Sequence, residues 1–279
     1  IAHPNIALAK YWGKRDVGEN LPAVPSISVT LAGMTTTTTV AQAERDVLVL
    51  DGEETDGRPL ERVQQTLDLI QPDRPRMRVE SRNDFPTAAG LASSASAFAA
   101  LAVAADAAFG TDLGAEALSS IARRVSASAG RSVFGGFVEL GTDGVSREIA
   151  APDHWDLRLV VCVTAEGKKE IGSTPGMQRT AATSPLYAAW VEAAPALCQR
   201  VREALLARDF AALGPAMEQS ALTMHASALA ADPGLIYWRG ATVDVMRRVR
   251  ELRAEGLSAY FTIDAGPHVK VFTTADELP

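Results

Sequence analysis

The sequence predicts an α+β protein built from two lobes, and three observations support this prediction. The chain has 279 residues, more than a single hydrophobic core usually holds, and 47% of them are hydrophobic. β-type runs dominate residues 26–50, whereas helix-favouring stretches dominate beyond about residue 165. We therefore expect an N-terminal domain over residues 1–164 and a C-terminal domain over residues 165–279.

The elements of the N-terminal domain follow from alternation and from turn residues. The expected strands lie at 5–11, within 26–50, at 77–81, at 134–140 and at 157–164, and the expected helices at about 60–70, 93–108 and 115–129. Gly110 closes the second helix, and the third is expected to end near Gly130. The last strand reads as buried because it is almost entirely apolar.

Helix signals dominate the C-terminal domain. Ser184-Pro185 is typical of a helix start, and this helix is expected to reach about residue 207 with a disturbance at Pro195. Asp209 and Thr242 are expected to cap the next helices. A hairpin of strands is then expected at 259–264 and 268–273, around Gly266-Pro267.

Composition and charge exclude several kinds of partner. The formal net charge of −7 argues against a nucleic-acid or anionic-membrane surface, so local cations must hold any anionic substrate. No apolar run reaches the ~18 residues of a membrane span, and no signal-peptide pattern opens the chain, so we expect a cytoplasmic protein. The two cysteines and four histidines lack metal-ligand spacing, and no metal-ligating residue is predicted.

The segment from Pro86 to Ser96 places a small-residue loop and a pair of hydroxyls directly before an alanine-rich helix. Backbone N–H groups at a helix N-terminus carry partial positive charge, and a loop without bulky side chains lets phosphate oxygens approach them. The segment is therefore a candidate phosphate-binding loop, although it lacks the Gly-Lys-Ser/Thr of the P-loop motif. From these residues alone, a helix capped by Ser93 and packed through its alanines explains the segment as well.

Five segments, in order from residue 5 to about residue 273, together resemble a known family. They are Asn5 to Asp16, Phe85 to Ser94, Ser126 to Ser132 followed by Phe134-Gly135-Gly136, Ser173 to Met177, and Tyr260 to Pro267. The pattern resembles the superfamily of galactokinase, homoserine kinase, mevalonate kinase and phosphomevalonate kinase, and within it most closely the mevalonate diphosphate decarboxylases. Chance is a poor explanation for so many motifs in the expected order.

The resemblance implies a two-lobed GHMP-kinase fold, with an N-terminal lobe like domain 2 of ribosomal protein S5, a ferredoxin-like C-terminal lobe and the active site in the cleft. It implies ATP-dependent decarboxylation of mevalonate 5-diphosphate to isopentenyl diphosphate through phosphorylation of the 3-hydroxyl, with ADP, phosphate and CO2 released. The implied cofactors are ATP and Mg2+, the partner is this small-molecule substrate, and the implied assembly is a homodimer. Family members normally have a leading strand and a trailing helical segment, so we expect both ends of this chain to be incomplete.

The resemblance implies catalytic roles for Asp264, Lys10 and Arg131. Asp264 matches the aspartate that accepts or orients the proton of the substrate hydroxyl, although an Asp before such a turn is commonly a cap. Lys10 is expected near Asp264, where it would keep the carboxylate ionised and meet phosphate, unless it only snorkels from a strand end. Arg131 matches the arginine that holds the departing carboxylate, and the alternative is an Arg that offsets a helix dipole.

Further matches predict the residues that contact substrate and ATP. The predicted substrate contacts are Tyr11, Lys14, Ser126, Ser128, Ser173 and Thr174, and the predicted ATP contacts are Ala89, Gly90, Leu91, Ala92, Ser93 and Ser94. Tyr11, Lys14, Ser173 and Thr174 belong with the diphosphate end of the substrate. Because lone serines usually act as caps, the serine assignments depend on the resemblance.

Several departures from the family pattern leave the phosphate number of the substrate open. They are Ala127 for a glycine, Gly130 for a Cys or Ser, Val24-Pro25-Ser26 for a polar set such as Asn-Ser-Ser, and His268 for an Asn. The alternatives are a mevalonate 5-phosphate decarboxylase, a mevalonate 3-kinase-type enzyme and a catalytically silent nucleotide-binding homologue. Retention of Asp264 and Lys10 argues against the kinase, and retention of the phosphate loop and charged trio argues against the silent homologue.

Overall fold

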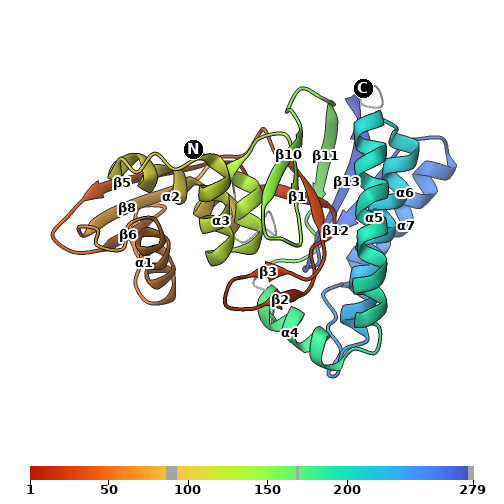
Figure 1. Ribbon diagram of the computed structural model, residues 1–279. Coiled ribbons are helices and arrows are strands. Elements are labelled where there is room, and N and C mark those ends of the chain that lie inside the picture. The colour runs from red at the N-terminus through yellow and green to blue at the C-terminus, as the bar shows by residue number, and fades with distance from the viewer. Residues whose placement is uncertain (86–92, 168–169, 276–279) are drawn as a thin grey trace. The chain divides into compact units, whose positions relative to one another are not determined.

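The computed structural model describes residues 1–85, 93–167 and 170–275, and the chain forms two compact units (Figure 1). Unit 1 consists of Ile1–Ile6, Asp16–Leu21 and Val29–Ile149, and unit 2 of Ala7–Arg15, Pro22–Ser28 and Ala150–Pro279. The predicted boundary after residue 164 stays a prediction. Residues 150–164 belong to unit 2, because the strand at 157–162 pairs with the strand at 269–274.

Unit 1 contains a four-stranded sheet of order β5-β8-β6-β7. These strands are β5 (Thr36–Gln42), β8 (Met77–Asn83), β6 (Val47–Leu50) and β7 (Glu53–Glu54). The helices are α1 (Arg58–Ile70), α2 (Ser93–Phe109) and α3 (Ala115–Val125), followed by the 3-10 helix η1 (Ala127–Val133). β8 pairs antiparallel with β5 and parallel with β6, and α2 packs on β5 (Figure 1).

The helices of unit 1 follow the sequence pattern closely. α1 buries Val63, Leu67 and Ile70, whose spacing of three and four residues places them on one face. α2 is buried through its alanines, which lets neighbouring helices approach closely, and Gly110 ends it in the left-handed region with φ 66°. The resulting core joins buried residues of β6, β8, α1, α2 and α3.

A second four-stranded sheet has the order β1-β4-β9-β10, and a short two-stranded sheet joins β2 to β3. The strands are β1 (Asn5–Ala9), β2 (Lys14–Asp16), β3 (Leu21–Pro22), β4 (Ser26–Thr30), β9 (Phe137–Leu140) and β10 (Ser146–Ala150). The chain passes from one unit to the other within β1 and within β4. β1 is buried along its whole length, so the polar side chains that flank its apolar centre need internal partners.

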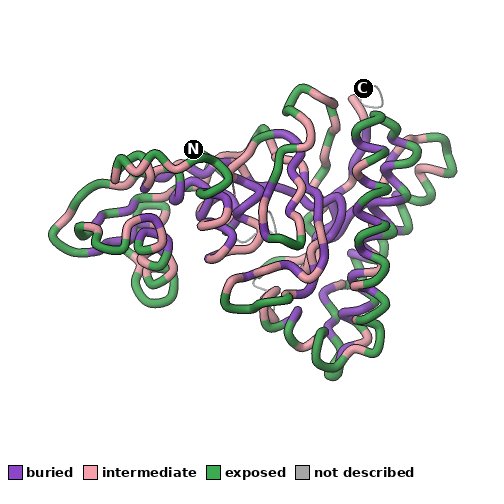
Figure 2. Tube along the Cα trace, in the orientation of Figure 1, coloured by how far each residue is buried: buried purple, intermediate pink, exposed green. Residues whose placement is uncertain are grey.

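In its described residues, unit 2 contains a three-stranded antiparallel sheet and four helices. The sheet order is β11-β13-β12, and the elements are β11 (Leu157–Cys162), α4 (Ser173–Thr183), α5 (Tyr187–Ala207), α6 (Phe210–Leu229), α7 (Gly240–Ala254), β12 (Tyr260–Ile263) and β13 (Val269–Thr274). α6 and α7 pack on β12, and α5 packs on α6 (Figure 1). α5 alternates between buried and exposed residues, as an amphipathic helix does (Figure 2).

Most predicted elements of unit 2 are confirmed. The hairpin of β12 and β13 is antiparallel, and the Asp209 side chain caps α6 by accepting from the Ala212 N–H at 2.9 Å. The expectation that Thr242 caps α7 was wrong in position, because Arg239 is the N-cap residue and Thr242, at the third position of the helix, accepts from the Arg239 N–H at 3.0 Å. Among the described residues, no helix combines the length and apolar character that crossing a bilayer requires.

Four details differ from the sequence prediction. α3 ends at Val125, because Ser126 is extended and the chain continues as a 3-10 helix. The strand at 157–164 is shorter and half-exposed, since β11 stands at one end of its sheet order. α5 begins at Tyr187, because Ser184 ends α4, and α4 itself was not predicted. The predicted end of α5 near residue 207 is confirmed, and the disturbance expected at Pro195 stays a prediction.

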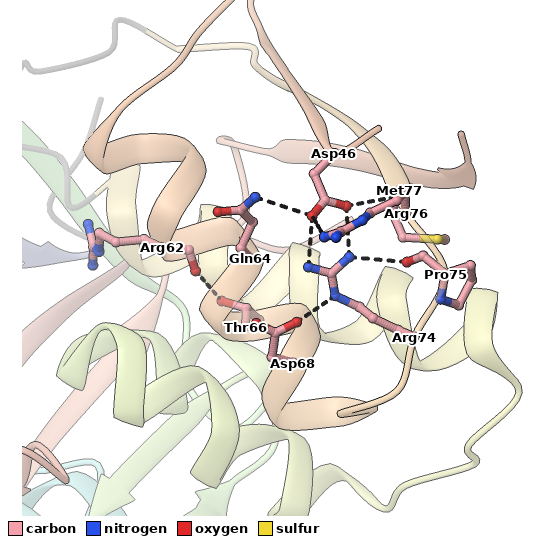
Figure 3. A network of polar contacts seen from close by, with 9 residues as sticks. All are labelled: Asp46, Arg62, Gln64, Thr66, Asp68, Arg74, Pro75, Arg76 and Met77. Atoms are coloured by element: carbon pink, nitrogen blue, oxygen red, sulfur yellow. Dashed lines mark hydrogen bonds and ion pairs between the residues drawn. The ribbon is translucent and has the colours of Figure 1, made fainter. Parts of the chain in front are cut away.

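A buried ion-pair network links α1 to the sheet of unit 1 (Figure 3). The Asp46 carboxylate and the Arg74 guanidinium are 5% and 4% exposed and lie 2.8 Å apart. The carboxylate also accepts from the Met77 N–H of β8 at 2.9 Å and from Gln64 of α1 at 3.2 Å. Burial alone raises the pKa of Asp46, but these hydrogen bonds and the Arg74 charge outweigh it and hold the pKa well below its usual range.

We predict that Asp46→Ala lowers the free energy of unfolding by about 3 kcal/mol, because the buried Arg74 loses its buried carboxylate partner and keeps the exposed Asp68. Since the folded-state pKa of Asp46 lies below the ordinary value, its contribution is present above about pH 4 and is lost as the pH falls. Urea denaturation at pH 7 measures the loss. Glu54→Ala, which removes an exposed ion pair with Arg45, is the control and should change the midpoint little. Equal effects of both variants would contradict the role given to the network.

Candidate active site

The carboxylate of Asp264 lies between two buried lysines of unit 2. Lys10 Nζ is 2.6 Å from Oδ1, and Lys270 Nζ is 3.1 Å from Oδ2. Both lysine side chains are 2% exposed, whereas the Asp264 side chain is 33% exposed. The contact expected between Lys10 and Asp264 is therefore present. The second lysine was not predicted.

Local structure explains why Asp264 projects at this point. Asp264 directly follows β12, and the Gly266 N–H donates to its carbonyl at 2.6 Å, which closes a tight turn. The hydroxyls of Thr164 and Thr242 both donate to the carbonyl of Pro267, at 2.6 and 2.7 Å. The turn that carries the carboxylate is therefore fixed from two directions.

Lys10 is fixed through its backbone as well as through its ammonium group. It directly follows β1, and its N–H donates to the Ser220 hydroxyl of α6 at 2.9 Å. Ser220 is itself buried. This bond holds the Lys10 backbone against α6. The same helix packs on β12, the strand that ends directly before Asp264.

Asp264 is held in its ionised form. Burial raises the pKa of this carboxyl group, but the charges of Lys10 and Lys270 and their hydrogen bonds outweigh burial, and the net pKa is well below its usual range. An ionised carboxylate with part of its surface open to solvent can accept a proton from a ligand. The arrangement can therefore serve a general base or a group that orients a hydroxyl.

His225 of α6 supports the same turn from its buried side. It is 1% exposed, and its Nε2 lies 3.1 Å from the carbonyl of Asp264, so the protonated nitrogen donates to that oxygen. Burial, followed by the charge of Lys10, lowers the pKa of His225 to about 4. The imidazole is therefore neutral at physiological pH and acts as a hydrogen-bond donor rather than as a charge.

Arg131 lies in unit 1, so the expected trio of Asp264, Lys10 and Arg131 is divided between the two units. Arg131 is on η1, is 3% exposed and donates from Nη2 to Asn5 Oδ1 at 3.3 Å. The Asn5 amide in turn donates to the Ser132 hydroxyl at 2.7 Å and to the Ser128 carbonyl at 3.1 Å. Asn5 thus ties β1 to the 3-10 turn that carries the arginine.

Ser126 and Ser128 flank the start of this 3-10 turn, and both are half-buried. Ser126 ends α3, and its carbonyl accepts from the Ala129 N–H at 2.7 Å. The Ser128 carbonyl is held by Asn5. The backbones of both serines are therefore fixed by hydrogen bonds to their carbonyls.

Lys14 and Thr174 meet in unit 2. Lys14 Nζ donates to Thr174 Oγ1 at 2.9 Å, and Thr174 stands with Ser173 in the first turn of α4. Gly13 precedes Lys14 with φ 108°, and a Cβ there would collide with the Tyr187 hydroxyl. Tyr11 is half-buried against the apolar cluster of α5 and α6. The Lys14 ammonium group lies beside the N-terminus of α4, and this arrangement is suited to binding an anion.

Of the six predicted ATP contacts, Ala89, Gly90, Leu91 and Ala92 lie outside the described residues. Ser93 and Ser94 open α2, the first half-buried and the second exposed. The predicted position of hydroxyls at a helix N-terminus is therefore present. The Ser93 carbonyl accepts from the Ser96 hydroxyl at 3.2 Å, one turn further on.

Unit 1 also contains an apolar cavity of about 480 Å³ beside α2, which the sequence did not predict. Its lining comes from β5, β6, β8, α1 and α2, namely Thr38, Leu48, Leu50, Arg58, Pro59, Arg62, Val63, Val79, Ser81, Ala97, Phe98 and Leu101. Arg62 lies 4.2 Å over the ring of Phe98. The volume falls within the range of small-molecule sites.

The sequence reasoning missed three polar residues of the site. Lys270 carried the same signal as Lys10, since each is a cation in an otherwise apolar strand run. Asn5 stood inside a recognised motif, but an uncharged amide gives no sign of its partner. His225 lies in the middle of a helix, and nothing in its neighbourhood points to Asp264 thirty-nine residues later.

Comparison with known proteins identifies the family. Residues 2–149 match the diphosphomevalonate decarboxylase-like N-terminal domain, and residues 159–279 match the mevalonate 5-diphosphate decarboxylase C-terminal domain. The diphosphomevalonate decarboxylase of Candida albicans is 37% identical over 96% of this chain and 82% of that protein. The phosphomevalonate decarboxylase of Haloferax volcanii is 37% identical over 99% of this chain and 88% of that protein.

Solved structures agree with this result. The structure of MDDEF in complex with MVAPP, AMPPCP and magnesium superposes with a TM-score of 0.92, at 39% identity over 99% of this chain and 88% of that one. The predicted α+β GHMP-kinase fold is therefore confirmed. The chain belongs to the diphosphomevalonate decarboxylase family.

We predict that the stability of the protein depends on pH through His225. Because its pKa falls from 6.5 to about 4 on folding, the unfolded chain binds the proton more readily, and stability is lost as the pH falls below 6.5. Between pH 7 and pH 5 this group alone costs about 2 kcal/mol of unfolding free energy. Urea denaturation at both pH values should show a smaller loss in His225→Gln than in the wild type. Equal losses in the two proteins would contradict the burial of a neutral imidazole.

Proposed function

We propose that this chain catalyses the ATP-dependent decarboxylation of mevalonate 5-diphosphate to isopentenyl diphosphate. The single observation that supports it most is the ionised Asp264 carboxylate held between Lys10 and Lys270, in a chain of this family. A half-exposed base fixed by two cations is suited to a reaction that begins with a hydroxyl group.

The first step is transfer of the γ-phosphoryl group of ATP to the 3-hydroxyl. The hydroxyl oxygen forms a bond to the γ-phosphorus, the bond between that phosphorus and the ADP oxygen breaks, and Asp264 accepts or orients the hydroxyl proton. The Lys10 ammonium lies 2.6 Å from this carboxylate, so it can also stabilise negative charge on the phosphoryl group in transit. Phosphorylation converts a poor leaving group into a good one.

In the second step the phosphate ester leaves and CO2 is released. The carbon–oxygen bond at C3 breaks, the bond between the carboxylate carbon and C2 breaks, and that electron pair forms the double bond of the product. Arg131 is the residue we assign to the carboxylate, because a planar guanidinium can hold it through two hydrogen bonds. The bond from Arg131 to Asn5 fixes the guanidinium before the substrate arrives.

The cavity beside α2 is the proposed site of the adenine base. It is mostly apolar, it is large enough for a flat ring system, and Ala97 in its lining lies one turn beyond Ser93. A base in this cavity would place the phosphates toward the N-terminus of α2, where backbone N–H groups and the hydroxyls of Ser93 and Ser94 can meet them.

Mg2+ is the proposed metal, held by the ATP phosphates with at most a serine hydroxyl from the protein. In the described part of the chain, no group of three or more His, Cys, Asp or Glu could hold a metal ion. This fits a metal that keeps several waters and binds mainly through substrate phosphates. When bound, Mg2+ supplies charge neutralisation on the phosphates.

The diphosphate end of the substrate is assigned to the first turn of α4. Lys14, Ser173 and Thr174 offer an ammonium group, two hydroxyls and backbone N–H groups at a helix N-terminus. Tyr11 is assigned to the same end, and Ser126 and Ser128 to the body of the substrate. These assignments rest on the sequence motifs and on the local geometry of each unit.

Mevalonate 5-phosphate is the second candidate substrate, and the similarity to the Haloferax volcanii phosphomevalonate decarboxylase favours it. The chemistry at C3 is the same for both substrates. A homodimer and a cytoplasmic location remain predictions from the sequence.

The proposed function is tested by following ADP and CO2 release in parallel with mevalonate, its 5-phosphate and its 5-diphosphate, each with Mg-ATP. Equal ADP and CO2 with the diphosphate alone would support the proposal. The same result with the 5-phosphate alone would make mevalonate 5-phosphate the substrate. Release of ADP without CO2 would make the protein a kinase. Absence of both products with every substrate would reject the activity.

We predict that Asp264→Asn lowers turnover by at least ~10²-fold, because an amide cannot accept the hydroxyl proton. ATP binding should stay nearly unchanged, since the proposed nucleotide site lies in unit 1. Steady-state kinetics and calorimetric titration with ATP measure the two effects. Near-normal turnover of this variant would exclude Asp264 as the base.

We predict that Ala97→Trp raises the KM for ATP by about tenfold or more, because the indole fills the cavity that we assign to the base. The turnover number at saturating ATP should change much less. Ala107→Trp, on the exposed side of the same helix, is the matched control and should leave the KM unchanged. An unchanged KM in Ala97→Trp would place the base elsewhere.

A further inference from the structure

Lys270 occupies an unusual place for a lysine. It lies on β13, the central strand between β11 and β12, and its side chain is 2% exposed. Its ammonium group has two oxygen contacts, to Asp264 Oδ2 at 3.1 Å and to the carbonyl of His268 in its own strand at 3.4 Å. A buried ammonium group is costly, so this position calls for a reason.

In the described part of unit 2, the titratable groups that contact or flank Asp264 are basic ones. Within the described part of unit 2, the titratable groups around this carboxylate are Lys10, Lys270, His225 and His268. Burial lowers the pKa of both histidines, with the charges of Lys10 and Lys270 adding to it, so both are neutral at pH 7. Two ammonium groups therefore contact the one carboxylate of Asp264.

The two lysines are held differently. Lys10 directly follows the end of β1, and its ammonium group approaches Oδ1, whereas Lys270 projects from the middle of a sheet and approaches Oδ2. If Lys10 also contacts the transferred phosphoryl group, its N–H donors are shared between that group and the Asp264 carboxylate. During that sharing, a carboxylate paired with Lys10 alone would lose part of its stabilisation and take up a proton more easily.

We propose that Lys270 is a positioning residue that keeps the Asp264 carboxylate ionised and oriented while Lys10 engages the transferred phosphoryl group. This inference rests on the proposed function, in which Asp264 is the base and Lys10 meets phosphate. Lys270 acts only through Asp264 and contacts no reacting atom.

The first test needs no turnover. The Asp264 carboxyl group is titrated by 13C NMR in the wild type and in two neutral variants, Lys270→Met and Lys270→Gln. Loss of one close cation should raise the midpoint by about one pH unit or more in both variants. Gln keeps a hydrogen-bond donor without the charge, so a shift in Met alone would mean that only the hydrogen bond matters and would overturn the proposal. No shift in either variant would overturn it as well.

The second test uses the reaction. The acid limb of the pH profile of kcat/KM should move upward by about one unit in both neutral variants and return toward the wild-type position in Lys270→Arg. Thr273→Val, which removes a buried hydroxyl on the same strand, is the matched control and should leave the profile unmoved. An acid limb at the wild-type position in the neutral variants would contradict the proposal.

The unfolding temperatures of the variants distinguish a positioning role of Lys270 from a structural one. Because an apolar side chain replaces a buried ammonium group and Asp264 keeps Lys10 as its partner, Lys270→Met should unfold at the wild-type temperature or above it. A clear fall in the unfolding temperature of both neutral variants, with an unmoved pH profile, would make Lys270 structural. If the wild type released neither ADP nor CO2, the proposed function would fail, and the NMR titration would still decide whether Lys270 holds Asp264 ionised.

Discussion

The pairing of the Asp264 carboxylate with two buried ammonium groups is the interaction on which the candidate site of unit 2 depends. A carboxylate at this position would be costly without a cation beside it. The β12–β13 hairpin brings Asp264 and Lys270 together, and the end of β1, bonded to Ser220 of α6, brings Lys10. His225 adds a neutral donor that fixes the turn without adding charge. The site is therefore rigid and electrostatically prepared before any ligand binds.

Unit 1 shows the same principle with different groups. Asn5 has three partners there, and through them it fixes the orientation of the Arg131 guanidinium. The Asp46 network holds α1 against the strands, and α1 forms one wall of the apolar cavity. In both units, buried polar groups with hydrogen-bond partners position the surfaces that we assign to the ligands.

The sequence predicted the order of the major elements, because apolar periodicity and capping residues are local signals. It also predicted the contact of Lys10 with Asp264, through the resemblance to a family. It could not predict the roles of Asn5 and His225, since these come from contacts between residues far apart in the chain, whereas Lys270 was missed although it is a cation in an apolar strand run, as Lys10 is. The start of α5, the short α3 and the exposure of β11 were wrong, because local patterns do not show which neighbouring element ends a helix or leaves a strand at a sheet edge.

The central claim is that Asp264 receives the proton of the substrate 3-hydroxyl while Arg131 holds the carboxylate that leaves. A crystal structure of the protein with mevalonate 5-diphosphate, a non-hydrolysable ATP analogue and Mg2+ tests it most directly. The account predicts the 3-hydroxyl oxygen within about 2.6–3.2 Å of the Asp264 carboxylate, and the substrate carboxylate on Arg131. A substrate whose 3-hydroxyl is hydrogen-bonded to another side chain, or whose carboxylate does not contact Arg131, would contradict the account.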